Sequence, residues 1–319
     1  MIPVRGNHRK RRGSLSRGAA STIKRVCGCL TEKRTEAMHI TSFHTELVIL
    51  PPARTAPPNI FRNTEFNRRR YELMLAEMQR LRGSVYLRDG AIQKHELTAD
   101  GRHRLSVDEQ SWHILLADGA KRVKGCMRYL EEKRASRFDE LWIRQSALTD
   151  CPVWGRKFRR AVEHEMERAS RKQMSFGEVG GWAVAEERRG TVDPLRMVLA
   201  TCGLFRLLGG CVGLATATVR HGSAAILRRI GLTPLTLNDQ ELPSYYDPRY
   251  GCQMEALRFD SDFPNVKYAN AINELSDMME LMPLISCESR APEWSGRLSG
   301  IDLPPAERPG RGALQPLAV

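Results

Sequence analysis

Residues 176–218, FGEVGGWAVAEERRGTVDPLRMVLATCGLFRLLGGCVGLATAT, decide the fold of this 319-residue chain. The run FGEVGGWAVA reads as a buried strand, and the charged turn EERRGT follows it. Asp193 and Pro194 have the residue types of an N-cap and a first helical position, so a helix is expected to begin there. CVGLATAT reads as a second buried strand. Because Arg206 and a glycine pair interrupt residues 197–218, we predict a helix and a strand there rather than a membrane span.

Elements on both sides of this stretch alternate in the same way. Upstream, we expect a strand over residues 40–50 and a helix over 66–82. A hairpin follows over 112–117 and 123–130, with Asp118-Gly119 as its turn, and then a helix over 153–172. Downstream come a short helix over 223–230, stopped by Gly231, and a strand over 253–259. This order predicts an α/β (α+β) fold in which helices cover a mixed sheet.

Charge divides the chain unevenly. Residues 1–37 hold ten Arg and Lys against two Glu, so they carry most of the net charge of +13. They contain few large apolar residues, so we expect a disordered basic tail. After this tail we expect a strand and a Pro-rich linker over residues 38–65, and then a core over 66–260. Residues 261–319 should form a docking helix over 268–284 and a disordered C-terminal tail.

Positive charge favours acidic partners. No aromatic residue interleaves the basic ones in residues 1–37, so stacking on nucleic acid is not expected, whereas a peripheral membrane contact stays open. The eight cysteines are scattered without paired CxxC motifs, so neither a metal site nor a disulfide framework is predicted. No apolar signal segment follows the basic N-terminus, and we predict a cytoplasmic protein of unknown oligomeric state.

Two clusters could carry chemistry. Glu178 lies in a strand that otherwise reads as buried, and burial raises a carboxyl pKa toward the range of a general base. Gly180-Gly181 would let a ligand approach that strand. The alternative is an edge-strand glutamate beside a packing glycine pair. Likewise, Arg188, Arg189, Gly190 and Thr191 precede a helix N-terminus, and they form either a phosphate-binding loop or a solvated turn.

These elements together resemble the GNAT superfamily, and several motifs resemble acyl-homoserine-lactone synthases and N-acyl amino acid synthases. The similar motifs, in chain order, are RGSVY (82–86), DEQSWH (108–113), GCMR (125–128), EVGGWAV (178–184), ILRRIGL (226–232) and YYDPRYGCQM (245–254). The likeness covers residues 66–260 and implies a GNAT-like, mostly antiparallel central sheet flanked by helices.

The resemblance also implies a reaction and its residues. An amine would attack a fatty acyl thioester carried by acyl carrier protein phosphopantetheine or by coenzyme A, with no tightly bound cofactor. Glu178 would take the amine proton through a water molecule, and Trp182, Ala183 and Val184 would hold the thioester. The acyl donor or an acidic carrier would meet Arg188, Arg189, Gly190 and Thr191. The small amine acceptor would meet Arg82, Arg128, Tyr245 and Tyr246.

Departures from the family pattern shift this expectation. The first and last positions of the family's coenzyme A loop are occupied here by Glu187 and Val192, which differ from the family pattern. This difference favours a carrier-protein donor over coenzyme A. Gly180-Gly181 replaces the Ser-Arg of lactone synthases, which disfavours lactone synthesis. Two alternatives remain: an acyl-homoserine-lactone synthase, and an inactive GNAT-fold binding module whose basic tail binds nucleic acid or membrane.

Overall fold

The computed structural model describes residues 45–132 and 136–288, so the predicted basic tail and the C-terminal tail lie outside the described residues. In the described part, ten strands form one sheet. They are β1 (Thr45–Leu50), β2 (Thr64–Phe66), β3 (Trp112–Asp118), β4 (Val123–Glu132), β5 (Ser175–Val184), β6 (Cys211–Thr218), β7 (Thr233–Pro234), β10 (Tyr245–Asp247), β11 (Cys252–Asp260) and β12 (Leu284–Ser286).

The strand order is β10-β11-β6-β5-β4-β3-β1-β12-β2, and β7 also pairs with β11. Pairing is antiparallel except between β5 and β6, β1 and β12, and β12 and β2. A separate two-stranded ribbon joins β8 (Thr236–Leu237) and β9 (Gln240–Glu241). This mixed, mostly antiparallel sheet confirms the predicted fold class.

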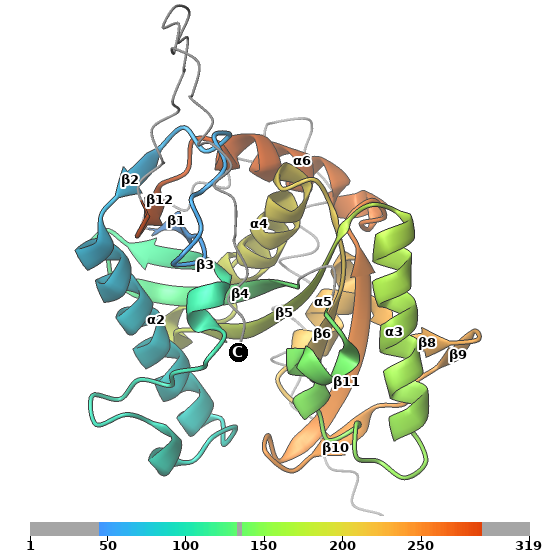
Figure 1. Cartoon of the computed structure of the whole chain (residues 1–319). Coiled ribbons are helices and arrows are strands. Elements are labelled where there is room, and N and C mark those ends of the chain that lie inside the picture. Colours follow the sequence, from blue (N-terminus) through green and yellow to red (C-terminus); the bar gives the residue numbers. More distant parts are fainter. Residues whose placement is uncertain (1–44, 133–135, 289–319) are drawn as a thin grey trace, which may run out of the picture. The chain divides into compact units, whose positions relative to one another are not determined.

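Helices cover both faces of the sheet (Figure 1). Their bounds are α2 (Arg68–Arg88), α3 (Gly155–Arg171), α4 (Asp193–Leu207), α5 (Ser223–Ile230) and α6 (Val266–Met279). On one face, α2 packs on β4 and β5 and α3 packs on β5 and β6. On the other face, α4 packs on β3 and β4 and is itself covered by α6. The sheet reaches beyond residues 66–260, because β1 and β12 lie in it.

Several predicted elements match the structure closely. The hairpin of β3 and β4, the strand β6 and the helix α5 lie where the pattern predicts them. The apolar stretch over 197–218 is indeed a helix and a strand, with Met197 and Val212 fully buried. No helix among the described residues is long and apolar enough to cross a bilayer.

Three boundaries were wrong. The first helix continues to Arg88 because Gly83 is a packing glycine and not a stop: a Cβ there would lie 2.8 Å from the carbonyl oxygen of Gly101. The helix α4 has Val192 as its N-cap, and Asp193 is its first residue. The last helix ends at Met279, and Leu284 belongs to β12, because amphipathic spacing alone does not separate a final helical turn from a short buried strand.

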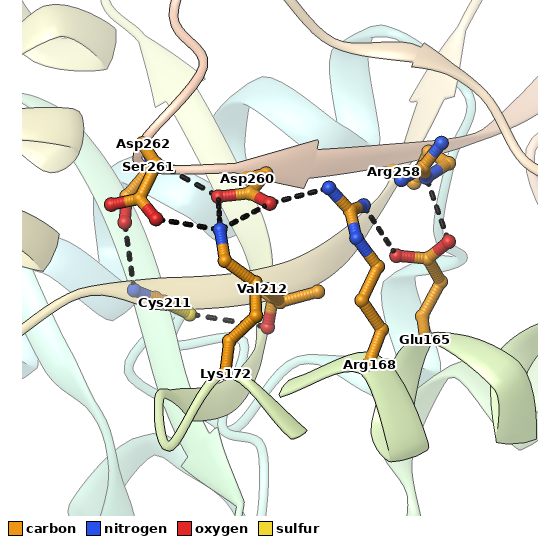
Figure 2. A network of polar contacts seen from close by, with 9 residues as sticks. All are labelled: Glu165, Arg168, Lys172, Cys211, Val212, Arg258, Asp260, Ser261 and Asp262. Carbon is orange, nitrogen blue, oxygen red and sulfur yellow. Dashed lines mark hydrogen bonds and ion pairs between the residues drawn. The ribbon is translucent and has the colours of Figure 1, made fainter. Parts of the chain in front are cut away.

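An ion network fixes α3 to the strand β11 (Figure 2). Asp260 has a 5% exposed side chain and accepts hydrogen bonds from Arg168 and Lys172. Lys172 also contacts Asp262, and Arg258 lies 2.7 Å from Glu165. The network anchors the C-terminal end of the helix that covers β5 and β6, beside the paired start of these strands, where Val212 faces Asp260.

Candidate active site

The strands β5 and β6 diverge at the centre of the sheet. They pair in parallel only from Ser175 to Val179 on β5, whereas β6 continues to Thr218 along β11. On the other side, the register of β5 against β4 shifts near Arg128, which is typical of a β-bulge. From Gly180 onward, one backbone edge of β5 therefore has no strand partner within residues 45–132 and 136–288.

A cavity of about 560 Å³ opens at this divergence. Residues of both diverging strands line it, together with residues at the end of α2, in segment 142–146 and in β10 and β11. An open pair of strand edges offers backbone N–H and C=O groups to an extended ligand. The sequence expectation that a cofactor arm approaches this strand stays a prediction.

Glu178 forms part of the cavity wall and is 4% exposed. Its Oε1 accepts a hydrogen bond from the backbone N–H of Trp142 at 2.7 Å, at the start of the 3₁₀ helix η4 (Trp142–Gln145). Burial, followed by the negative charge of Glu132, raises the pKa of Glu178 to about 8. Since β5 lies between β4 and β6, the alternative of an edge-strand glutamate is wrong.

Arg128 lies beside Glu178 in the same wall. It pairs with Gly180, two residues along β5 from Glu178, and it is 3% exposed. Its Nε and Nη1 atoms have no hydrogen-bond partner among the described residues, and its guanidinium lies 5.2 Å from the ring centroid of Trp142. A buried cation without a partner is costly, so the cavity here favours an anion.

Arg82 does not line the cavity. It is fully buried behind the wall, where its guanidinium donates to both oxygens of Asp108, at 2.9 and 2.7 Å. Although burial raises the pKa of Asp108, this bond outweighs burial and holds that pKa at about 2. His113 is buried as well, and its Nε2 donates to the backbone carbonyl of Asp108 at 2.8 Å. Of the two arginines predicted to bind the acceptor, Arg128 thus lines the cavity and Arg82 does not.

The glycine pair has a specific conformation. Gly181 has φ +62°, which side chains rarely adopt, and a Cβ there would lie 3.3 Å from Cβ of Arg128. The arginine that lactone synthases carry at this position would therefore be strained here.

The predicted donor residues divide into two groups. Trp182, Ala183 and Val184 line the cavity, as do Arg189 and Gly190. Arg189 is bound to Asp89 at 2.7 Å. By contrast, Arg188 lies 3.6 Å from Asp193, and the hydroxyl of Thr191 accepts a hydrogen bond from the backbone of that residue; neither lines the cavity.

The two tyrosines also separate. Tyr245 lines the cavity, and burial raises its pKa, while its hydroxyl contacts Ser146. Tyr246 is 57% exposed and is not part of the lining. Their adjacent positions in β10 point them to opposite faces.

Other lining residues were not predicted from the sequence. They include Trp142, His103, Arg220 and Tyr250. His103 is 8% exposed, burial lowers its pKa, and its Nδ1 has no partner among the described residues. His103, Arg220 and Tyr250 lie in loops and turns, and Trp142 lies in the one-turn 3₁₀ helix η4, so no periodicity signals which way these side chains point.

No group of three His, Cys, Asp or Glu side chains in the described ranges is placed to hold a metal ion. No family model matches the chain, and no curated protein matches it in sequence.

Solved structures with a related chain trace do exist. BjaI, a CoA-dependent acyl-homoserine lactone synthase, is 16% identical with a TM-score of 0.46, over 76% of this chain and 92% of that one. LasI, an acyl-homoserine-lactone synthase, is 14% identical with a TM-score of 0.43, over 72% and 95%. FeeM, an N-acyl amino acid synthase from uncultured soil microbes, is 11% identical with a TM-score of 0.40, over 68% and 91%.

Proposed function

We propose that this chain is an N-acyltransferase that moves an acyl group, of long chain, from a thioester to the amine of an amino acid. One observation carries the proposal. A buried carboxyl, Glu178, lies beside a buried guanidinium, Arg128, where β5 and β6 part, and Nε and Nη1 of Arg128 have no hydrogen-bond partner among the described residues. A base and an anion receptor so close together suit a substrate that carries an amine and a carboxylate on one carbon.

The acceptor carboxylate would bind Arg128 through its free Nε and Nη1, with Trp142 stacked behind the guanidinium. This places the acceptor amine near Glu178. Because the amine must lose a proton to become an amide, ionised Glu178 would take that proton as nitrogen bonds to the thioester carbon. Arg82 would act behind the wall, holding Asp108 and the loop that carries His103.

The acyl donor would enter along the open edge of β5. Backbone groups from Trp182 to Val184 would hold the thioester carbonyl and stabilise the oxyanion, and the thiolate would then leave. Arg189, beside Gly190 at the cavity wall, would meet the donor phosphate after exchanging its contact with Asp89. The altered loop ends, Glu187 and Val192, favour phosphopantetheine on an acidic carrier protein over coenzyme A.

Lactone synthesis is the second candidate, and the strained position at Gly181 argues against it. The third, an inert binding module in the cytoplasm, would need no buried base. Its test is separate: deleting residues 1–37 should abolish a salt-dependent affinity for nucleic acid or anionic vesicles.

Acyl transfer is tested by incubating the protein with a panel of acyl-carrier proteins and acyl-coenzyme A thioesters, together with all common amino acids. Mass spectrometry should detect an N-acyl amino acid with at least one donor, and Glu178→Gln should lower its rate by about 100-fold or more. No product with any pair in this panel would contradict the proposal.

Arg128→Met separates acceptor binding from catalysis. It should raise KM about 10- to 100-fold for an amino acid but change it little for the matching amino acid amide, which lacks the carboxylate. Equal effects on the two acceptors would show that Arg128 does not bind the carboxylate.

A further inference from the structure

Glu132, the last residue of β4, lies next to the candidate base. In the register of β4 and β5, Leu130 faces Glu178 and Glu132 faces Phe176. The two glutamates therefore point to the same face as diagonal neighbours. Diagonal pairs in antiparallel sheets are about 7–8 Å apart at the backbone, which two long side chains can span.

The carboxyl of Glu132 accepts few hydrogen bonds. Its Oε1 is buried and has no hydrogen-bond partner among the described residues, while its Oε2 lies 3.5 Å from the hydroxyl of Ser136. A buried carboxylate oxygen without a donor costs free energy. Since the neighbouring side chain is a second carboxyl, one proton held between them would satisfy that oxygen.

The charged groups around the two carboxyls also favour one shared proton. Arg128 on β4 is the nearby cation, Glu140 on the 3₁₀ helix η3 (Phe138–Glu140) adds a further negative charge, and Leu214 on β6 adds none. Burial raises the pKa of Glu132, while its contact with Glu178 acts in the opposite direction. Two carboxyls held together in a buried site do not ionise independently.

We propose that Glu132 is a positioning residue for Glu178, and that the two carboxyls share one proton, so that Glu132 strengthens Glu178 as a base. The inference rests on the proposed function. In the active form both carboxyls are ionised. As the N–H bond of the amine breaks, an O–H bond forms on Glu178, and this becomes the proton that the two carboxyls share. That O–H is donated to ionised Glu132. The proton later leaves to water, and the bonding pair of the N–H bond stays on nitrogen as the amide forms.

The experiment compares the pH dependence of kcat/KM in the wild type, Glu132→Gln and Glu131→Gln, with one acceptor. Glu131 is the matched control, because it precedes Glu132, points to the opposite face and binds Ser175 instead. Glu132→Gln should move the acidic limb of the profile to lower pH by about one pH unit or more, and lower the plateau. Glu131→Gln should leave the limb in place.

If the wild type is active and the acidic limb of Glu132→Gln stays where it is in the wild type, the inference is overturned while the proposed function stays intact.

A second measurement needs no enzymatic activity. Carboxyl ¹³C NMR of the glutamate-labelled wild type should show one resonance that titrates near pH 8. In Glu132→Asp, and in Glu132→Gln if it folds, that midpoint should fall. A midpoint that stays near pH 8 in these variants would also overturn the inference.

Discussion

Replacing Glu178 with glutamine should inactivate the protein and also make it more stable, by an amount that grows with pH. The wild-type carboxyl is buried, and its pKa is about 8 in the folded protein against 4.5 ordinarily. Between these two values the folded protein keeps a proton that the unfolded chain has lost. Wild-type stability therefore falls as pH rises from about 4.5 to 8 on account of this group. Glutamine resembles the protonated acid in shape and does not titrate.

The magnitude follows from the same pair of values. Each pKa unit corresponds to about 1.4 kcal/mol, so full ionisation of Glu178 costs the fold at most about 5 kcal/mol. Local relaxation and water entry reduce such costs. We therefore expect the free energy of unfolding of Glu178→Gln to exceed that of the wild type by about 1–3 kcal/mol at pH 8.5. For a protein of this size, that raises Tm by about 2–6 °C. Below pH 4.5 the gain should vanish.

The assay is thermal and urea unfolding of both proteins from pH 4 to 9, with Glu131→Gln as the control for loss of an exposed charge. The difference in unfolding free energy between Glu178→Gln and wild type isolates the pair of Glu178 and Glu132, because the titrating groups outside this pair are common to both proteins. A difference that stays constant with pH, or that shrinks as pH rises, would refute the reasoning. The control should differ from wild type by less than about 0.5 kcal/mol at every pH.

Three further predictions concern the scaffold. Asp108→Asn removes one partner of a buried ion pair and should cost about 3 kcal/mol by urea unfolding; a loss under about 1 kcal/mol would mean that water compensates the arginine. Gly181→Ala should cost about 1–2 kcal/mol because of its positive φ, and an unchanged midpoint would contradict the strain argument. Asp260→Asn should destabilise by about 1–3 kcal/mol, whereas Asp262→Asn, whose side chain is 49% exposed, should cost under about 1 kcal/mol; equal losses would show that burial does not set the difference.

The elements most visible in the sequence are those with a local cause. The Asp118-Gly119 turn between two apolar runs defines a hairpin, and Gly231 ends a short helix, because turn and cap conformations depend on a few adjacent residues. Gly83 shows the limit of such signals. The residue type is that of a helix end, but its role is to let a distant loop approach.

For the candidate site, the sequence by itself determined that one carboxyl lies in an apolar strand before a basic turn, and so indicated Glu178. It also determined the order of helices and strands, since periodicity is a property of consecutive residues. Only the tertiary structure decided which arginine faces the cavity. Arg82 and Arg128 are equally basic in the sequence, but Asp108 neutralises the first, while Nε and Nη1 of the second have no hydrogen-bond partner in the described part of the chain. The proximity of Glu132 to Glu178 likewise depends on the register of two strands whose facing residues are more than forty positions apart. No local sequence pattern contains that register.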